Sequence, residues 1–75
     1  MKYTKDIYLA AAFLASGATL VSVDRTDPLH QEFQFEPSKG DLDDIMGQYV
    51  NRRLTINVAD YRDALQRIKS ALHSY

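Results

Sequence analysis

The stretch "IYLAAAFLASGATLVSV", residues 7–23, decides the fold, because it runs 17 positions without a charged side chain in a chain of 75 residues. A helix that spans a membrane needs about 20 predominantly apolar residues, whereas the second half of this stretch contains two serines, a threonine and a glycine. A basic start followed by an apolar block also fits an export signal, but Asp6 interrupts the basic region. We therefore expect the core of a small water-soluble domain in the cytoplasm, with export as the weaker alternative.

Gly17 divides this stretch into a helix and a strand. Thr4 or Asp6 can cap the helix, the alanines favour it, and Gly17 suits the left-handed position after its last turn. The residues that follow, "ATLVSVDR" at 18–25, are rich in β-branched side chains and alternate as a strand does. One face of this strand is predicted to carry Thr19, Val21, Val23 and Arg25.

The first helix has no charged side chain on any face between Ile7 and Ser16. A helix that is apolar all round is normally buried all round, and a two-layer domain leaves one side of such a helix facing water. Either a second copy of the protein covers that side, or the last helix of the same chain packs over it. The sequence leaves both alternatives open.

The middle of the chain predicts a second strand and a second helix. The turn "TDPL" at 26–29 leads into "HQEFQFE" at 30–36, in which Phe33 and Phe35 point to one face. After a loop at 37–40, in which Ser38 marks the helix start, Leu42, Ile45, Met46 and Tyr49 have the spacing of one helical face. The next segment, "NRRLTIN" at 51–57, alternates as a short edge strand or an extended connector does.

The last helix carries the clearest periodic signal. Asn57 and Asp60 form a capping pair at its start. Apolar residues then recur every three or four positions, which is the spacing of one helical stripe. The stripe consists of Val58, Tyr61, Leu65, Ile68, Leu72 and Tyr75.

These elements predict one α+β domain over residues 1–75. Its order is helix, strand, strand, helix, short strand or connector, helix, with the helices on one face of a small antiparallel sheet. Hydrophobic residues make up 45% of the chain. There is no cysteine, so neither disulfides nor thiolate metal sites stabilise the fold. The formal net charge is −1, but residues 26–50 carry −5 (one lysine against six carboxylates) and residues 51–75 carry +3 (five cations against two carboxylates).

No group of residues forms a catalytic motif. Neither a nucleophile motif nor a glycine-rich phosphate loop is present in a chain with three glycines. His30, Glu32 and Glu36 would share one face of a strand, but a fourth metal ligand is missing. We therefore expect no enzymatic activity, no catalytic residue, no metal and no cofactor.

Three stretches resemble an uncharacterised family of short bacterial and phage domains, a domain of unknown function. They are Asp6-Ile7-Tyr8-Leu9-Ala10-Ala11 leading to Gly17, Phe33-Gln34-Phe35, and the closing helix from Tyr61 to Leu72 with Ala64-Leu65 and Ile68-Lys69-Ser70. The resemblance spans nearly the whole chain and rests mostly on core and capping residues. It implies a phage or mobile-element setting and no established reaction.

We expect a non-enzymatic interaction module that docks to a protein, through self-association or to another partner, since aromatic residues are common interface anchors. The predicted interface consists of Tyr8, Ala12, Phe13, Tyr49 and Tyr75. The alternative is a small DNA- or RNA-binding accessory protein with a basic C-terminal surface. That surface would consist of Arg52, Arg53, Arg62, Arg67 and Lys69. No membrane partner and no small-molecule substrate are expected.

Overall fold

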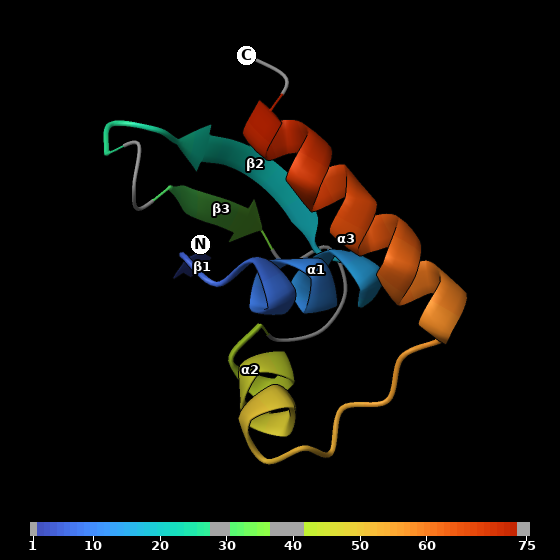
Figure 1. Ribbon diagram of the computed structural model, residues 1–75. Coiled ribbons are helices and arrows are strands. Elements are labelled where there is room, and N and C mark those ends of the chain that lie inside the picture. Colours follow the sequence, from blue (N-terminus) through green and yellow to red (C-terminus); the bar gives the residue numbers. More distant parts are fainter. Residues whose placement is uncertain (1, 28–30, 37–41, 74–75) are drawn as a thin grey trace.

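The computed structural model describes residues 2–27, 31–36 and 42–73. These residues form three strands and three helices (Figure 1). In order they are β1 (Lys2–Thr4), α1 (Ile7–Ala15), β2 (Thr19–Asp24), β3 (Glu32–Glu36), α2 (Leu42–Val50) and α3 (Val58–His73). The predicted α+β class and the antiparallel sheet are confirmed. Among the described residues, no helix is long and apolar enough to cross a membrane.

The sheet has the strand order β1-β3-β2, and both pairs are antiparallel. Strand β1 was not expected from the sequence. Lys2 pairs with Phe35 and Thr4 pairs with Phe33, so this three-residue segment becomes a strand because β3 lies beside it. Pairing with a distant strand decides β structure more strongly than local propensity does.

Strand β2 contains an irregularity at Val21. Leu20 pairs with Phe35 and Ser22 pairs with Gln34, so Val21 is an extra residue with no partner in the register. The predicted alternation of Thr19, Val21 and Val23 is therefore wrong. Val21 is exposed, while Leu20 and Val23 are half-buried against the core.

Helix α1 is capped at both ends as the sequence predicts. The side chain of Asp6 accepts a hydrogen bond from the Tyr8 N–H at 2.9 Å. At the other end Gly17 has a φ of 101°, and the Ala18 N–H donates to the Phe13 carbonyl at 3.0 Å. This turn sends the chain from α1 directly into β2.

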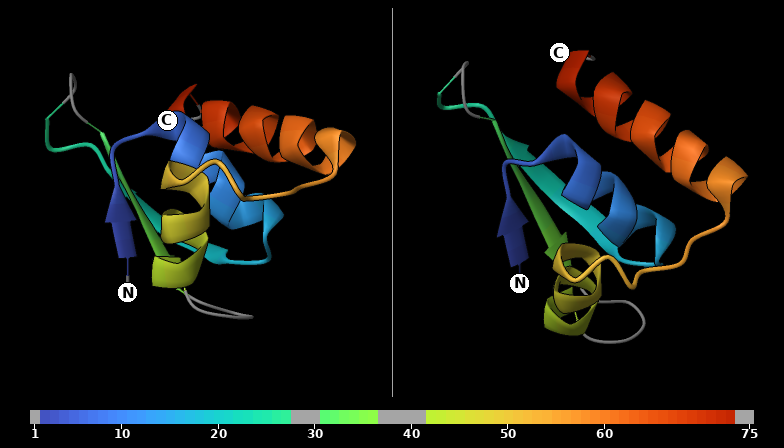
Figure 2. Two further views of the ribbon diagram at one scale, coloured as in Figure 1. Left: turned by 90° about the horizontal axis from the view of Figure 1, so that it is seen from below. Right: turned by 60° about the horizontal axis from the view of Figure 1, so that its bottom comes forward.

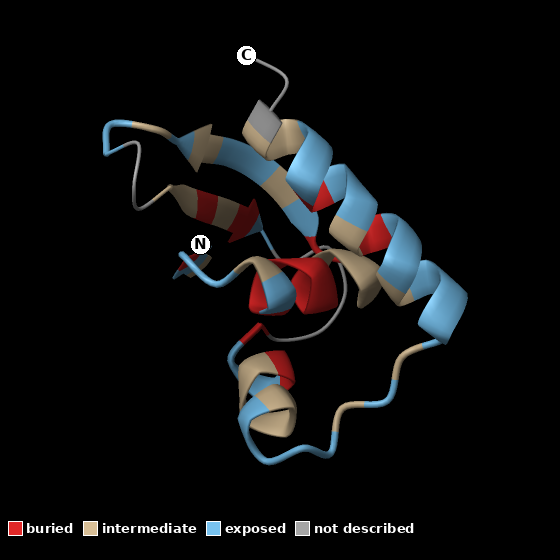
Figure 3. Ribbon diagram, in the orientation of Figure 1, coloured by how far each residue is buried: buried red, intermediate tan, exposed pale blue. Residues whose placement is uncertain are grey.

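The core lies between the sheet and the helices, which pack on one side of it (Figure 2). Phe13 of α1, Phe33 and Phe35 of β3, and Ile68 of α3 are the largest fully buried side chains. The Phe13 and Phe35 rings meet edge to face, with 5.3 Å between their centroids, a favourable arrangement for aromatic pairs. Figure 3 shows the buried residues concentrated in α1 and β3.

Helix α1 is covered by its own chain. Leu9, Ala10, Ala11, Ala12 and Phe13 are all buried, with α3 packed on α1 and α2 beside it. The alternative in which the last helix packs over α1 is therefore correct. Most of the apolar surface expected to be bare on α1 is therefore covered, and Tyr8 is the exposed residue of this helix.

The segment between α2 and α3, residues 51–57, is an extended connector and not a strand. It ends at Asn57, whose side-chain oxygen accepts hydrogen bonds from the N–H groups of Ala59 and Asp60 at 2.9 and 3.2 Å. The predicted cap of α3 is confirmed. The predicted helix start at Ser38 and the end of the α3 stripe at Tyr75 lie outside the described residues.

Candidate functional site

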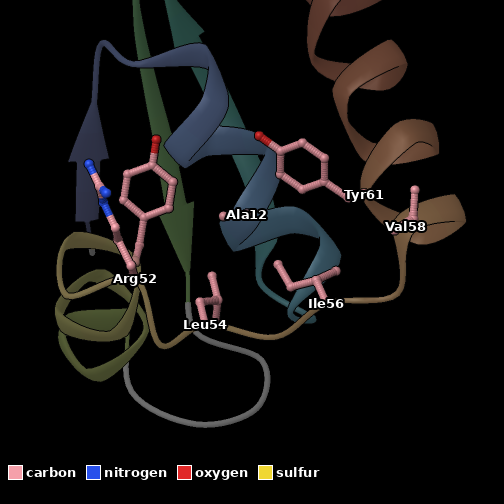
Figure 4. Close-up of a pocket in the computed structure, with 7 residues that line it drawn as sticks. Ala12, Arg52, Leu54, Ile56, Val58 and Tyr61 are labelled. Carbon is pink, nitrogen blue, oxygen red and sulfur yellow. The ribbon is translucent and has the colours of Figure 1, made fainter.

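A groove opens between α1, the end of α2, the connector and the start of α3 (Figure 4). Its volume is about 450 Å³, within the range of ordinary binding pockets. The residues that line it, which we call the tyrosine groove, are Ala12, Tyr49, Arg52, Leu54, Ile56, Val58 and Tyr61. Six of these seven side chains are apolar or aromatic, and the seventh, Arg52, carries a positive charge. The groove therefore suits an apolar ligand with an anionic group.

Small and aliphatic side chains form the floor and one wall of the groove. Ala12 is buried on α1, and its methyl group leaves space that a larger residue would fill. Leu54 and Ile56 point from the connector toward α1 (Figure 4). Both are half-buried, whereas Arg53 and Thr55 are exposed, because alternate side chains of an extended segment point to opposite sides.

Tyr61 forms the wall on the α3 side. Its hydroxyl donates a hydrogen bond to the backbone carbonyl of Tyr8 at 3.1 Å, which holds the ring against α1. Burial raises the pKa of Tyr61, and the nearby Tyr49 and Asp6 raise it further. The phenol is therefore a neutral hydrogen-bond donor at pH 7.

Tyr49 approaches the start of α1 from α2. Burial raises its pKa, and the negative charge of the Asp6 carboxylate and a hydrogen bond to it raise the pKa further. Asp6 thus interacts with both the first turn of α1 and the Tyr49 hydroxyl. The two tyrosines lie on separate helices that both contact α1, so their placement depends on the tertiary fold.

Arg52 stands at the end of α2 in a backbone conformation that glycine usually adopts. Its φ is 59°, and a left-handed conformation costs most residues about 1–2 kcal/mol. The turn is closed by hydrogen bonds from the Arg52 N–H to the Tyr49 carbonyl and from the Arg53 N–H to the Gln48 carbonyl, at 3.2 and 2.8 Å. The strained backbone places an exposed guanidinium at the groove.

Exposed hydrophobic side chains lie around the groove. Val58, on the groove itself, is 83% exposed, and Tyr8, whose carbonyl binds Tyr61, is 54% exposed. Val50, next to Tyr49 in the chain, is 68% exposed. Apolar surface that gathers around a hollow often marks an interaction site.

The structure brings part of the predicted interface to this place. Ala12 and Tyr49 line the groove, and the backbone carbonyl of Tyr8 accepts the hydrogen bond from Tyr61. Phe13 has 0% exposure and packs on Phe35, so its side chain belongs to the core and is unavailable to a partner. Tyr75 lies outside the described residues.

The five predicted basic residues do not share one surface. Arg52 lines the groove and Arg53 follows it, exposed. Arg67 lines a hollow with Leu14 and Ala15 at the end of α1, where a cation complements the negative end of the helix dipole. Arg62 and Lys69 are exposed and lie on the flank of α3 that carries Val58, four residues before Arg62.

Four groove residues were not predicted as functional: Leu54, Ile56, Val58 and Tyr61. The alternation of the connector was a signal for the first two, but nothing local showed which element they would face. Within the part of the chain that the structure describes, no group of three or more His, Cys, Asp or Glu residues could hold a metal ion. His30 lies outside those residues.

In a comparison with protein families, the chain matches the model of a domain of unknown function, DUF5659, over residues 2–74. The chain belongs to the DUF5659 family. No curated protein and no solved structure matches it. The function proposed for this DUF5659 domain therefore rests on the geometry of the groove.

Proposed function

We propose that this domain is a non-enzymatic docking module and that the tyrosine groove receives a segment of a partner protein. The observation that carries the proposal is the groove itself, where two tyrosines from different helices flank a floor made by a small alanine. Aromatic side chains that surround a pocket are frequent anchors of protein interfaces. We place the module in the cytoplasm, in the phage or mobile-element setting that the family resemblance implies.

The polar groups of the groove favour binding over catalysis. The Tyr61 hydroxyl is bound to a backbone carbonyl, and the raised pKa values of Tyr49 and Tyr61 keep both phenols protonated. A protonated phenol is a poor nucleophile and a poor base. These side chains therefore orient a ligand more readily than they transform one.

Self-association is retained as one way in which the groove is occupied. Helix α3 covers α1, so α1 does not supply a bare apolar face for a second copy. Among the described residues the most exposed large hydrophobic side chain is Val58, which lines the groove. A contact between copies that buries Val58 would involve the groove.

The test is a selection of random 12-residue peptides on phage against the 75-residue domain, followed by amide chemical-shift mapping with the enriched peptides. We expect the largest shifts at Tyr49, Leu54, Ile56 and Tyr61. Filling the floor with Ala12→Leu should abolish binding. Gly47→Leu is the matched control, because a Cβ at Gly47 on α2 meets nothing within 4 Å.

Ala12 is buried, so a second variant protects the test against misfolding. Ile56→Ser on the half-buried connector removes an apolar wall and should weaken binding while the amide spectrum stays dispersed. Failure to enrich peptides, or shifts confined to the sheet face, would overturn the proposal. Light scattering at increasing concentration, with shift mapping on dilution, would show whether the occupant is a second copy.

A further inference from the structure

We infer that the occupant of the tyrosine groove is an acidic, apolar segment of a partner protein, in which carboxylates pair with arginines on the two walls. This inference rests on the proposed function and adds the chemistry of the partner to it. It is carried by Arg52 on the α2 side and Arg62 on the α3 side. Both are exposed, and neither takes part in a salt bridge with any residue that the structure describes.

The backbone of Arg52 adopts a conformation that residues with a side chain disfavour. Its left-handed backbone, with φ at 59°, suits glycine better than a residue with a side chain. The turn would form with glycine there, so the fold does not need an arginine at this position. What the arginine adds is a planar guanidinium at the groove, a group that pairs well with carboxylates.

Arg62 lies one helical turn after Val58, which lines the groove, and directly follows Tyr61. Residues four apart on a helix are neighbours on its surface, so Arg62 extends the α3 wall. The acidic residues of α3, Asp60 and Asp63, face the other way, where they line a hollow with Arg67 at the end of α1. The α3 flank beside the groove is therefore positively charged.

Asp6, an acidic residue near both tyrosines of the groove, is already engaged. The Asp6 carboxylate accepts the Tyr8 N–H at 2.9 Å and interacts with Tyr49. The positive charge at the groove is local, because the whole chain carries a formal charge of −1 and has an isoelectric point near 6.0. A partner with carboxylates is attracted to this place and not to the protein as a whole.

A nucleic acid also carries negative charge, but it fits this groove less well. Phosphate binding favours continuous basic surface, whereas the groove beside Arg52 is lined by the aliphatic side chains of Leu54, Ile56 and Val58. Aliphatic side chains of a peptide would bury that surface, and acidic side chains flanking them would reach Arg52 and Arg62. Charge complementarity and apolar lining together thus favour a peptide.

The probe is the most enriched 12-residue peptide from the selection, labelled with fluorescein, and a twin in which every Asp and Glu is replaced by Asn and Gln. We expect enriched peptides to combine aliphatic or aromatic residues with carboxylates. Loss of one exposed ion pair lowers affinity by about two- to fivefold. Arg52→Gly and Arg62→Ala should each have this effect on the acidic peptide, and the twin should bind both variants and the natural protein equally weakly.

Arg53→Ala is the matched control, since Arg53 is exposed and adjacent but does not line the groove. Its affinity for the peptide should be unchanged. Arg52→Gly should bind more weakly although its melting temperature is equal or higher, which separates binding from folding. Affinity for the acidic peptide should also fall as salt is raised from 50 to about 500 mM, because exposed pairs are screened.

The outcomes are distinguishable. If peptides shift the groove amides but bind Arg52→Gly and Arg62→Ala as tightly as the natural protein, the inference is wrong and the docking function stands. If no peptide reaches the groove, both are wrong. If a 12-nucleotide single strand binds more tightly than any peptide, or if the groove is occupied by a second copy in solution, the acidic-peptide inference is also overturned.

Discussion

The hydroxyl of Tyr61 donates a hydrogen bond to the backbone carbonyl of Tyr8, 53 residues earlier in the chain, across 3.1 Å. This bond joins α3 to the first turns of α1 and fixes one wall of the tyrosine groove. The ring of Tyr61 also packs against the core, so both the hydrogen bond and the ring hold this wall. A substitution that removes the hydroxyl and keeps the ring tests the hydrogen bond alone.

Tyr61→Phe should lower the free energy of unfolding by about 0.5–1.5 kcal/mol, the usual net value of one hydrogen bond. Urea unfolding followed by circular dichroism would measure the change. Because the ring remains, peptide affinity should stay within about twofold of the natural protein. An unchanged stability would show that the bond to Tyr8 contributes nothing to the fold.

Arg52→Gly should stabilise the protein. The left-handed backbone at Arg52 costs about 1–2 kcal/mol for a residue with a Cβ, partly offset by the larger entropy of glycine in the unfolded chain. We expect a net gain of about 0.5–1 kcal/mol, or a few degrees in the melting temperature of a domain this size. Arg53→Gly, where φ is not positive, should instead be destabilising. A gain at both positions, or at neither, would contradict the strain argument.

Phe13→Ala should bring the domain close to unfolding. Phe13 is fully buried and packs edge to face on Phe35, and truncation of such a residue costs about 3–5 kcal/mol. Small domains have only about 5–15 kcal/mol in total. Thermal unfolding would show the loss, and Tyr8→Ala, at a side chain that is 54% exposed, is the control that should lose far less.

Asp6→Ala should destabilise α1 and change the chemistry of Tyr49. Loss of the cap to the Tyr8 N–H lowers the free energy of unfolding by about 0.5–2 kcal/mol. The pKa of Tyr49 should fall toward its ordinary value, because the carboxylate that helps to raise it is gone. Ultraviolet titration of the phenols would detect this. Thr4→Val, which keeps Asp6, should leave the Tyr49 titration in place.

Stability should decline above about pH 10. Burial, followed by neighbouring charge, raises the pKa of Tyr49 and of Tyr61 in the folded protein, while unfolded tyrosines titrate near 10. The unfolded chain therefore releases phenolic protons first, so this stabilisation is complete below about pH 10 and is lost as pH rises through the folded pKa values. Tyr49→Phe should flatten the decline between about pH 10 and 12 relative to Tyr3→Phe, an exposed control. Equal slopes in the two variants would refute the assignment.

The helices and the β2–β3 hairpin could be predicted because their signals are local. Asp6 and Gly17 mark the limits of α1, Asn57 marks the start of α3, and the alternation of Phe33 and Phe35 identifies β3. Each of these signals acts within a few residues. The folded domain keeps these local signals, and the structure confirms the helices and strands that they predict.

Features that depend on distant partners could not be predicted in this way. Strand β1 exists because β3 lies beside it, and the shift at Val21 appears only once β2 is paired. More than half of the tyrosine groove was missed for the same reason. Leu54 and Ile56 alternate visibly in the sequence, but the helix that they face, α1, is about forty residues earlier. Phe13 was assigned to a surface because the sequence did not show that α3 covers α1.

The extra residue at Val21 also affects how the protein behaves at high concentration. Strand β2 is an outer strand of the sheet, and a regular edge invites a foreign strand to add to it. One unpaired residue near its middle bends the strand and disturbs the even sequence of N–H and C=O groups. Strand β2 is therefore a poor template for aggregation. The two edges of the sheet differ, because β1 has only three residues and β2 is bent at Val21.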